Sequence, residues 1–290
     1  MYTRGKSVFY SFVIVLLLLL LLNGCYSPRG ALTQPTLTPE PVPDPSWSSE
    51  RLATALYSFN PNNRWLALKY LKERGPAAAP SVPALMDILR SSPSVDTRAE
   101  AYNVLGSIGR GAKDAVPLLV EKLEEGETRD DKLGATAVLG IIGSDAKDSI
   151  PALIQVATND EDAEVRSNAA ESLGKISTNR EVLDFLITRL QTESSGEVQI
   201  GISLGLCAMG AKAQPAVPYL ANNLWWGQDD HGIKQAAAKA IANIVGVKFY
   251  DDVCAVGGFR EPFIDGELAT VVKAREWWTA IGQFQNWSQP

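Results

Sequence analysis

Histidine is almost missing from this sequence: 290 residues contain a single one, His231, and only three cysteines. Zinc sites take four ligands, most of them His or Cys, so one histidine argues against such a site. Small disulfide-stapled domains need several cysteine pairs, which three cysteines do not provide. Two of the three, Cys207 and Cys254, are expected either to pair in an oxidising compartment or to pack as small hydrophobic side chains.

An excess of positive charge is also missing. The chain has 27 Lys and Arg against 33 Asp and Glu, a net charge of −6. Without residues 1–24, which include Arg4 and Lys6, 25 cations remain against the same 33 acids, a net charge of −8. Because an acidic surface repels phosphate backbones, the composition argues against nucleic acid as a partner.

The N-terminal 24 residues are typical of a secretory signal, with a basic head, an apolar run over 8–22 and small residues before Cys25. The letters "LNGC" resemble the lipobox of bacterial lipoproteins, which implies cleavage between Gly24 and Cys25 and a diacylglycerol thioether on Cys25. The alternative is an uncleaved membrane anchor, because the apolar run approaches the length of a spanning helix. We prefer the lipobox, since an anchor has no need of Gly-Cys at this place.

Residues 25–47 form a proline-rich segment, which we interpret as a tether. Six prolines with Thr, Ser and Gln between them favour extended geometry and offer little apolar surface to bury. Lipidation at Cys25 would hold the remaining chain at a membrane on its extracytoplasmic face. The sequence therefore predicts an exported, lipid-anchored protein.

A repeat of 34 residues organises the middle of the chain. Each unit carries an apolar-Pro pair, a helical apolar pattern, a polar break, a cation 15 residues after the proline, and a Leu-Gly pair. In register stand Pro83, Pro117 and Pro151, the cations Arg64, Arg98, Lys132, Arg166 and Lys234, and Gly106, Gly140 and Gly174. Gln199 takes the position of the cation in the fifth unit.

Each unit predicts a hairpin of two helices. Proline is tolerated in the first helical turn, and Asp, Ser and Asn in the break cap the second helix. Such hairpins bury their apolar flanks only by stacking. We expect an all-α fold, a right-handed α-α superhelix of six hairpins over residues 48–245, with residues 246–290 as a helical C-terminal cap.

The unit resembles the HEAT repeat, most closely its phycobilisome-lyase HEAT-like subtype. The resemblance rests on "VPALM…VDTRAEAYNVLGSIG" and "IPALI…AEVRSNAAESLGKI" and covers about two thirds of the chain. It implies a solenoid fold. Because such repeats occur in bilin lyases, adaptors and other proteins, it does not choose between functions.

The stretch "LWWGQDDHG", residues 224–232, resembles a site in composition but falls in the turn of the sixth hairpin. Asp230 aligns with Asp162 as an N-cap, and a lone His231 in an exposed turn is expected to be solvated. Trp225 and Trp226 replace polar residues of other repeats. They are expected either to anchor a partner or to pack under the C-terminal segment, which holds Trp277, Trp278 and Trp287.

Two further candidates for ligand binding are set aside. Asp160, Asp162, Glu164 and Glu171 have the spacing of a calcium loop, but Val165 stands where the loop needs glycine. The ladder of cations is expected to bond within and between repeats, among the many nearby acids. We therefore predict no catalytic residue, no metal site and no cofactor.

A candidate partner-binding groove lies on the second helices, which line the concave face in HEAT proteins. Ser167, Glu171 and Lys175 form an expected polar stripe in hairpin four. The aligned residues are apolar in hairpin three (Leu133, Ala137 and Ile141) and in hairpin five (Ile200, Leu204 and Ala208). Two apolar columns beside a polar one would suit a bound peptide. The alternative is that slightly rotated helices bury these columns in the core.

These patterns favour a non-catalytic scaffold that binds a protein or peptide partner on its concave face. Two alternatives stay open, a bilin-lyase-like accessory enzyme and a structural spacer of the cell envelope. The sequence does not predict an oligomeric state or the identity of a partner.

Overall fold

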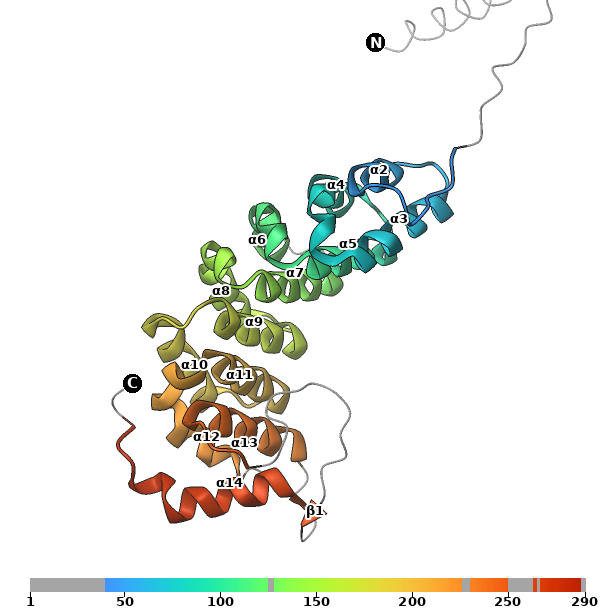
Figure 1. Ribbon diagram of the computed structural model, residues 1–290. Coiled ribbons are helices and arrows are strands. Elements are labelled where there is room, and N and C mark those ends of the chain that lie inside the picture. Colours follow the sequence, from blue (N-terminus) through green and yellow to red (C-terminus); the bar gives the residue numbers. More distant parts are fainter. Residues whose placement is uncertain (1–39, 125–127, 226–229, 250–262, 265–266, 288–290) are drawn as a thin grey trace, which may run out of the picture. The chain divides into compact units, whose positions relative to one another are not determined.

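The computed structural model describes residues 40–124, 128–225, 230–249, 263–264 and 267–287 (Figure 1). Val42–Pro290 forms one compact unit. Its described hydrophobic residues form a single core cluster that extends from Leu52 to Ala274. Because the whole cluster lies inside this unit, the unit has what it needs to fold without residues 1–41.

The described helices form six hairpins, each with a first and a second helix. The first helices are α2 (Ser49–Ala55), α4 (Val82–Ser91), α6 (Val116–Glu124), α8 (Ile150–Asn159), α10 (Arg180–Thr192) and α12 (Val217–Asn223). The second helices are α3 (Pro61–Arg74), α5 (Val95–Ile108), α7 (Arg129–Ile142), α9 (Ala163–Ile176), α11 (Gly196–Met209) and α13 (His231–Val245). Figure 1 shows α4 to α12 in one row and α5 to α13 in a second row beside it. The predicted all-α solenoid of about six hairpins is confirmed.

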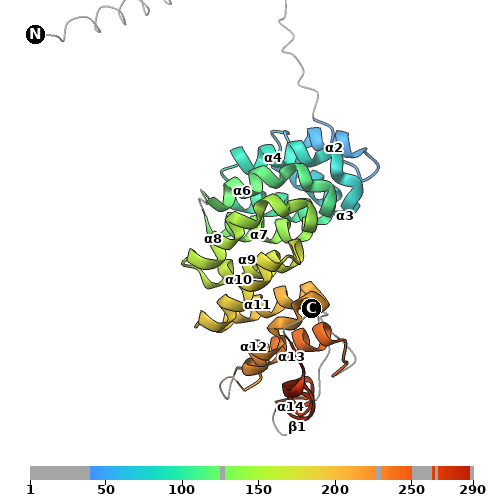
Figure 2. The ribbon, with the colours of Figure 1, turned by 90° about the vertical axis from the view of Figure 1, so that its left-hand side faces the viewer.

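Each second helix packs on the second helix of the next hairpin, from α3 on α5 through to α11 on α13. Figure 2 shows this order from the side of the first helices. Leucines such as Leu71, Leu105, Leu139 and Leu173, which recur every 34 residues, are fully buried between the rows. The 34-residue repeat of the sequence therefore places a leucine at the same buried position in successive hairpins.

Short 3-10 turns join most hairpins: η1 (Gly75–Ser81), η2 (Gly109–Ala115), η3 (Gly143–Ser149) and η4 (Gly210–Ala216). Each begins at a glycine with positive φ, a conformation that costs glycine little. Ser177 holds the same register after hairpin four but is extended, and Asn179 then caps α10 directly. This junction lacks a 3-10 turn because serine replaces the glycine that would start it.

Helices α9 and α11 pack so closely that any side chain at their contact glycines would clash. A Cβ added at Gly174 would lie 2.0 Å from the carbonyl oxygen of Gly205, and one at Gly201 would lie 2.3 Å from that of Ser167. The two backbones therefore touch. This contact also buries Ser167, whose hydroxyl donates to the Glu197 carbonyl at 2.9 Å.

The C-terminal segment has two short strands and a helix. β1 (Phe263–Ile264) pairs antiparallel with β2 (Glu267–Leu268), and α14 (Ala269–Ala280) and η5 (Gly282–Phe284) follow. α14 packs on α13 and buries Val271 and Ala274. The segment thus contacts the last hairpin of the stack, where an open solenoid end needs cover.

Candidate partner-binding face

The ladder of cations closes the turns inside the hairpins. Guanidinium nitrogens of Arg64, Arg98 and Arg166 each donate to a backbone carbonyl six residues earlier, at 2.7–2.8 Å. The side-chain amide of Gln199 makes the same bond at 2.8 Å, to Glu193. Gln199 therefore makes the same turn-closing hydrogen bond as the arginines, although it carries no positive charge. The expectation that the ladder bonds within and between repeats is confirmed for these residues.

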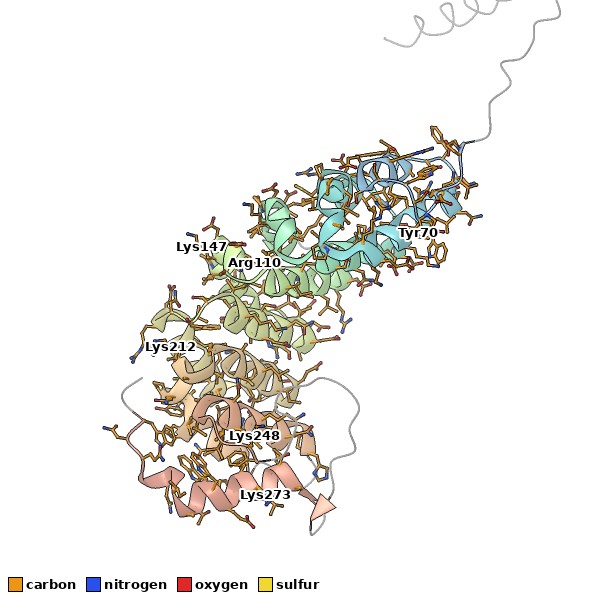
Figure 3. All side chains as sticks on the ribbon, in the orientation of Figure 1. Tyr70, Arg110, Lys147, Lys212, Lys248 and Lys273 are labelled. Atoms are coloured by element: carbon orange, nitrogen blue, oxygen red, sulfur yellow. The ribbon has the colours of Figure 1, made fainter. Side chains whose placement is uncertain are left out.

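Lys132 and Arg98 show the bonds between repeats. Lys132 Nζ lies 2.6 Å from Asp160 of the next hairpin. Arg98 binds Asp131 of the next hairpin through Nε at 2.9 Å and Nη2 at 3.0 Å. At the inter-hairpin turns, Arg110, labelled in Figure 3, reaches from η2 to Asp145 of η3. These cations hold adjacent hairpins together.

Asp131 is the most enclosed of these acids, with 1% of its side chain exposed. Burial alone would raise its pKa. Hydrogen bonds from Arg98 and Thr128, with the charges of Arg98 and Lys122, outweigh burial and lower the pKa of Asp131 below its usual value. The carboxylate therefore stays ionised inside the stack, where it binds Arg98 and links two adjacent hairpins.

The calcium-loop alternative is excluded by the contacts of its acids. Asp160 pairs with Lys132, and Asp162 caps α9 by accepting from the backbone N–H groups of Glu164 and Val165. Across the described ranges, no cluster of three or more His, Cys, Asp or Glu side chains could hold a metal ion.

The apolar columns of α7 and α11 lie at the surface. Ile141 is 50% exposed, Ala137 is exposed and Leu133 is half-buried on α7. On α11, Ile200 and Leu204 are half-buried and Ala208 is exposed. Ala137, Ile141 and Ala208 therefore lie at the surface, whereas Leu133, Ile200 and Leu204 are partly buried and Leu133 also packs against the core. We call the surface formed by Leu133, Ala137, Ile141, Glu171, Ile200 and Leu204 the second-helix face.

Between the two columns, α9 presents an ion pair. Lys175 Nζ lies 2.6 Å from Glu171 Oε1, one helical turn away, and both side chains are partly exposed. The third member of the expected polar stripe, Ser167, is buried, so that part of the prediction is wrong. The close contact between α9 and Gly201 of α11 covers Ser167, so the exposed polar strip consists of Glu171 and Lys175 alone.

The apolar side chains at the two sides of this face lean away from α9. The Cδ1 of Ile141 is the nearest atom to a Cβ placed on Gly106 of α5, and the Cδ1 of Ile200 is the nearest to one on Gly232 of α13. The Glu171–Lys175 pair is therefore flanked by apolar walls that do not close over it. Such a strip can contact both apolar and charged side chains of a partner.

The turn of the sixth hairpin differs from its prediction in two details. Asp230 stands at the N-cap position of α13, but its side chain makes no capping hydrogen bond. His231 is the first residue of α13 rather than a loop residue, and its side chain is partly exposed. Asp229 and Trp226 lie outside the described residues.

Trp225 meets the C-terminal segment through a cation. The Arg275 guanidinium of α14 lies 5.6 Å from the Trp225 ring centroid, and its Nε donates to the Leu224 carbonyl at 2.8 Å. Trp225 nevertheless stays 52% exposed. Trp277, Trp278 and Trp287 instead pack on one another, with ring centroids 6.1–6.4 Å apart. Trp225 therefore has both a contact with the cap and a free surface.

Cys207 is buried in α11 and is disulfide-bonded. Cys25 and Cys254 lie outside the described residues, as do residues 1–39, so the predicted signal sequence and most of the predicted tether are not described. Among the described helices, none combines the length and apolar character needed to cross a bilayer.

Sequence reasoning missed three exposed residues on the second helices of the first two hairpins. Ala99 and Asn103 are exposed on α5, and Trp65 is 56% exposed on α3. Trp65 precedes Ala99 by 34 residues, and Ala99 precedes Leu133 by 34. Extending the alignment that found Leu133 would have identified Trp65 and Ala99 at the equivalent positions.

Stacked helix hairpins with a common period define this protein as an α-solenoid, a helical-repeat scaffold of the kind that commonly mediates contacts between proteins. HEAT repeats match residues 49–140 and 123–207, which together cover more than half of the chain, and the chain belongs to the HEAT-repeat family. A solved structure described as an engineered protein, a structural genomics target, is 22% identical, with a TM-score of 0.46, over 68% of this chain and 96% of that one. Among curated proteins, none matches the chain significantly.

Proposed function

We propose that this protein is a non-catalytic scaffold that binds a protein partner along its second-helix face while a lipid on Cys25 holds it at a membrane. The observation that carries the proposal is the exposure of the α7 column, above all Ile141, which is half-exposed. Monomeric proteins rarely leave contiguous apolar surface open unless it binds something.

The composition of the face supports a protein as the partner. Side chains of Leu133, Ile141 and Leu204 supply apolar contact area, and Glu171 with Lys175 supplies charges of both signs. Protein interfaces combine an apolar centre with polar groups in this way. HEAT repeats commonly mediate protein–protein interactions, which agrees with this role.

The extracytoplasmic location is supported by two features. "LNGC" at residues 22–25 resembles a lipobox. The disulfide at Cys207 suits an oxidising compartment, because disulfides are rare where glutathione keeps thiols reduced. The proline-rich residues 26–47 would then link the solenoid to the membrane.

The face is tested by charge insertion. Leu133→Asp with Leu204→Asp puts two carboxylates into the apolar columns, and binding of the partner identified by crosslinking is expected to fall at least tenfold. The helical signal in circular dichroism should persist while the thermal midpoint falls, because both side chains are partly buried and Leu133 packs against the core. Gln155→Asp with Thr188→Asp, at exposed positions of α8 and α10, is the matched control and should leave binding unchanged. Loss of folding in the first variant would assign the columns to the core and contradict the proposal.

The anchor is tested separately. In cells, Cys25→Ser is expected to abolish incorporation of labelled palmitate and the size shift that accompanies signal cleavage. Labelled protein in the Cys25→Ser variant would show that the lipid is attached elsewhere and contradict the assignment.

A further inference from the structure

The first hairpin exposes three large aromatic side chains. Phe59 is 94% exposed, Tyr57 is 58% exposed and Trp65 is 56% exposed. Tyr57 and Phe59 lie in the loop between α2 and α3, and Trp65 lies in the first half of α3. An isolated apolar residue at a surface needs no explanation, but a group of aromatic residues at one end of a solenoid does.

The loop that carries Phe59 is held in place. Arg64 Nη1 donates to the backbone carbonyls of Ser58 at 2.7 Å and Phe59 at 3.3 Å, and the Asn60 side chain caps α3. Phe59 is therefore presented to solvent by a fixed backbone.

Cations accompany these rings. Lys69 Nζ lies 5.6 Å from the Trp65 ring centroid and 6.0 Å from that of Tyr70, which Figure 3 labels on α3. Lys72 follows on the same helix, is exposed, and lies 3.8 Å from Glu100 of α5. Trp65, Lys69 and Lys72 are spaced three and four residues apart on α3, and Phe59 lies in the loop just before this helix. We call Phe59, Trp65, Lys69 and Lys72 the basic aromatic end.

The first hairpin is the basic part of an acidic chain. Residues 48–81 contain five Lys and Arg and two Asp and Glu, a net charge of +3. Residues 82–290 contain 19 cations and 29 acids, a net charge of −10. The charge of the chain is therefore separated, with positive charge on the hairpin that directly follows the tether.

The tether enters at this same hairpin. Arg74 at the end of α3 donates to the carbonyls of Pro45, at 2.8 Å, and Trp47, and to the Ser49 hydroxyl. At about 3.1 Å per residue in polyproline geometry, residues 26–44 would reach roughly 60 Å at full extension. A lipid on Cys25 would therefore leave the first hairpin within reach of the bilayer surface.

We propose that the basic aromatic end docks on an anionic lipid surface, with Phe59 and Trp65 in the interfacial layer and Lys69 and Lys72 near the lipid phosphates. Aromatic rings favour the membrane–water interface, and each basic residue gains energy near anionic headgroups. The acidic body is repelled by the same surface. On α5, the small side chain of Ala99 and the amide of Asn103 separate the basic aromatic end from the α7 column.

Vesicle flotation tests this inference, which rests on the membrane location proposed above. The protein is residues 26–290 without lipid, since the compact unit Val42–Pro290 holds the described core. Circular dichroism verifies the fold of each variant. Vesicles of phosphatidylcholine with about one-third phosphatidylglycerol should bind the protein, and pure phosphatidylcholine should bind it far less. Binding should also weaken at high salt, because salt screens exposed charges.

Matched variants locate the contact. Lys69→Ala with Lys72→Ala should weaken binding about 25-fold, at roughly fivefold for each cation removed. Phe59→Ser with Trp65→Ser should weaken it at least tenfold. The controls are Trp225→Ser, a ring of similar exposure at the other end of the stack, and Lys113→Ala with Lys212→Ala, which remove exposed cations of the acidic body.

Three results would overturn the inference: no preference for anionic vesicles, equal losses in the Trp225→Ser control, or loss of self-association instead of vesicle binding in the Phe59 and Trp65 variant. The last result would assign the surface to a second copy of the chain. Failure here is separable from failure of the proposed function, because partner binding is tested at Leu133 and Leu204 and lipidation at Cys25.

Discussion

The pair formed by Arg98 and Asp131 offers the sharpest test of how adjacent hairpins are held together. Asp131 accepts hydrogen bonds from Arg98 Nε at 2.9 Å, Arg98 Nη2 at 3.0 Å, the Thr128 hydroxyl at 2.7 Å and the Tyr102 hydroxyl at 3.3 Å. Both side chains are nearly inaccessible to solvent, 9% for Arg98 and 1% for Asp131. Asp131→Ala therefore leaves a buried guanidinium without its carboxylate.

The expected cost follows from that geometry. Breaking a buried ion pair by removing one partner costs about 3–5 kcal/mol, because the remaining charge has lost its compensation. For a unit of this size, the thermal midpoint should fall by roughly 6–20 °C. Urea unfolding followed by circular dichroism measures the free energy of unfolding.

Two variants control the measurement. Asp130→Ala removes the neighbouring exposed carboxylate, and surface changes of that kind alter stability by at most about 0.5 kcal/mol. Arg98→Met with Asp131→Leu removes both charges and should be less destabilised than the sum of the two single changes. A cost for Asp131→Ala no larger than that for Asp130→Ala would refute the account of the pair as a clamp between hairpins.

Three further predictions follow from the same structure. Gly174→Ala should destabilise by about 1–3 kcal/mol in urea unfolding, because its Cβ would meet the Gly205 carbonyl, whereas Gly106→Ala, two repeats earlier, meets only the flexible end of Ile141 and should be tolerated. A lowered pKa for Asp131 means that its contribution to stability is present above the unfolded pKa and lost as pH falls through the folded pKa, so acid should destabilise the natural protein more than the Arg98→Met, Asp131→Leu variant. Arg275→Ala should increase acrylamide quenching of Trp225 fluorescence, measured with the other tryptophans replaced by phenylalanine, since it removes the cation beside that ring.

The fold could be predicted from the sequence because its signals are local and repeated. Proline in the first turn of α4 and α8, capping residues such as Asp162, and leucines every 34 residues each agree with the same hairpin. The bonding of the repeated cations within and between hairpins could also be predicted from the sequence, because acidic residues lie near most of them.

Other features depend on distances between helices, which the alignment does not contain. Ser167 aligns with Leu133 and Ile200, which are half-buried, yet it is buried because glycines bring α9 and α11 into backbone contact. The loss of the 3-10 turn after hairpin four traces to one residue, Ser177, in the glycine register. Which residues of the α7 and α11 columns are exposed, and which are partly buried, also depends on the packing itself.

The central claim is that the second-helix face binds a protein partner, and site-specific photo-crosslinking in cells tests it most directly. A photoreactive residue is placed at Ala137 on that face or at Ala208 one turn beyond Leu204 on α11, and at Gln155 or Thr188 on the first helices, all exposed positions. The account predicts that Ala137 and Ala208 crosslink to the same one or two proteins and that Gln155 and Thr188 do not. Crosslinks of equal strength from both rows of helices, or none from Ala137 and Ala208, would contradict it.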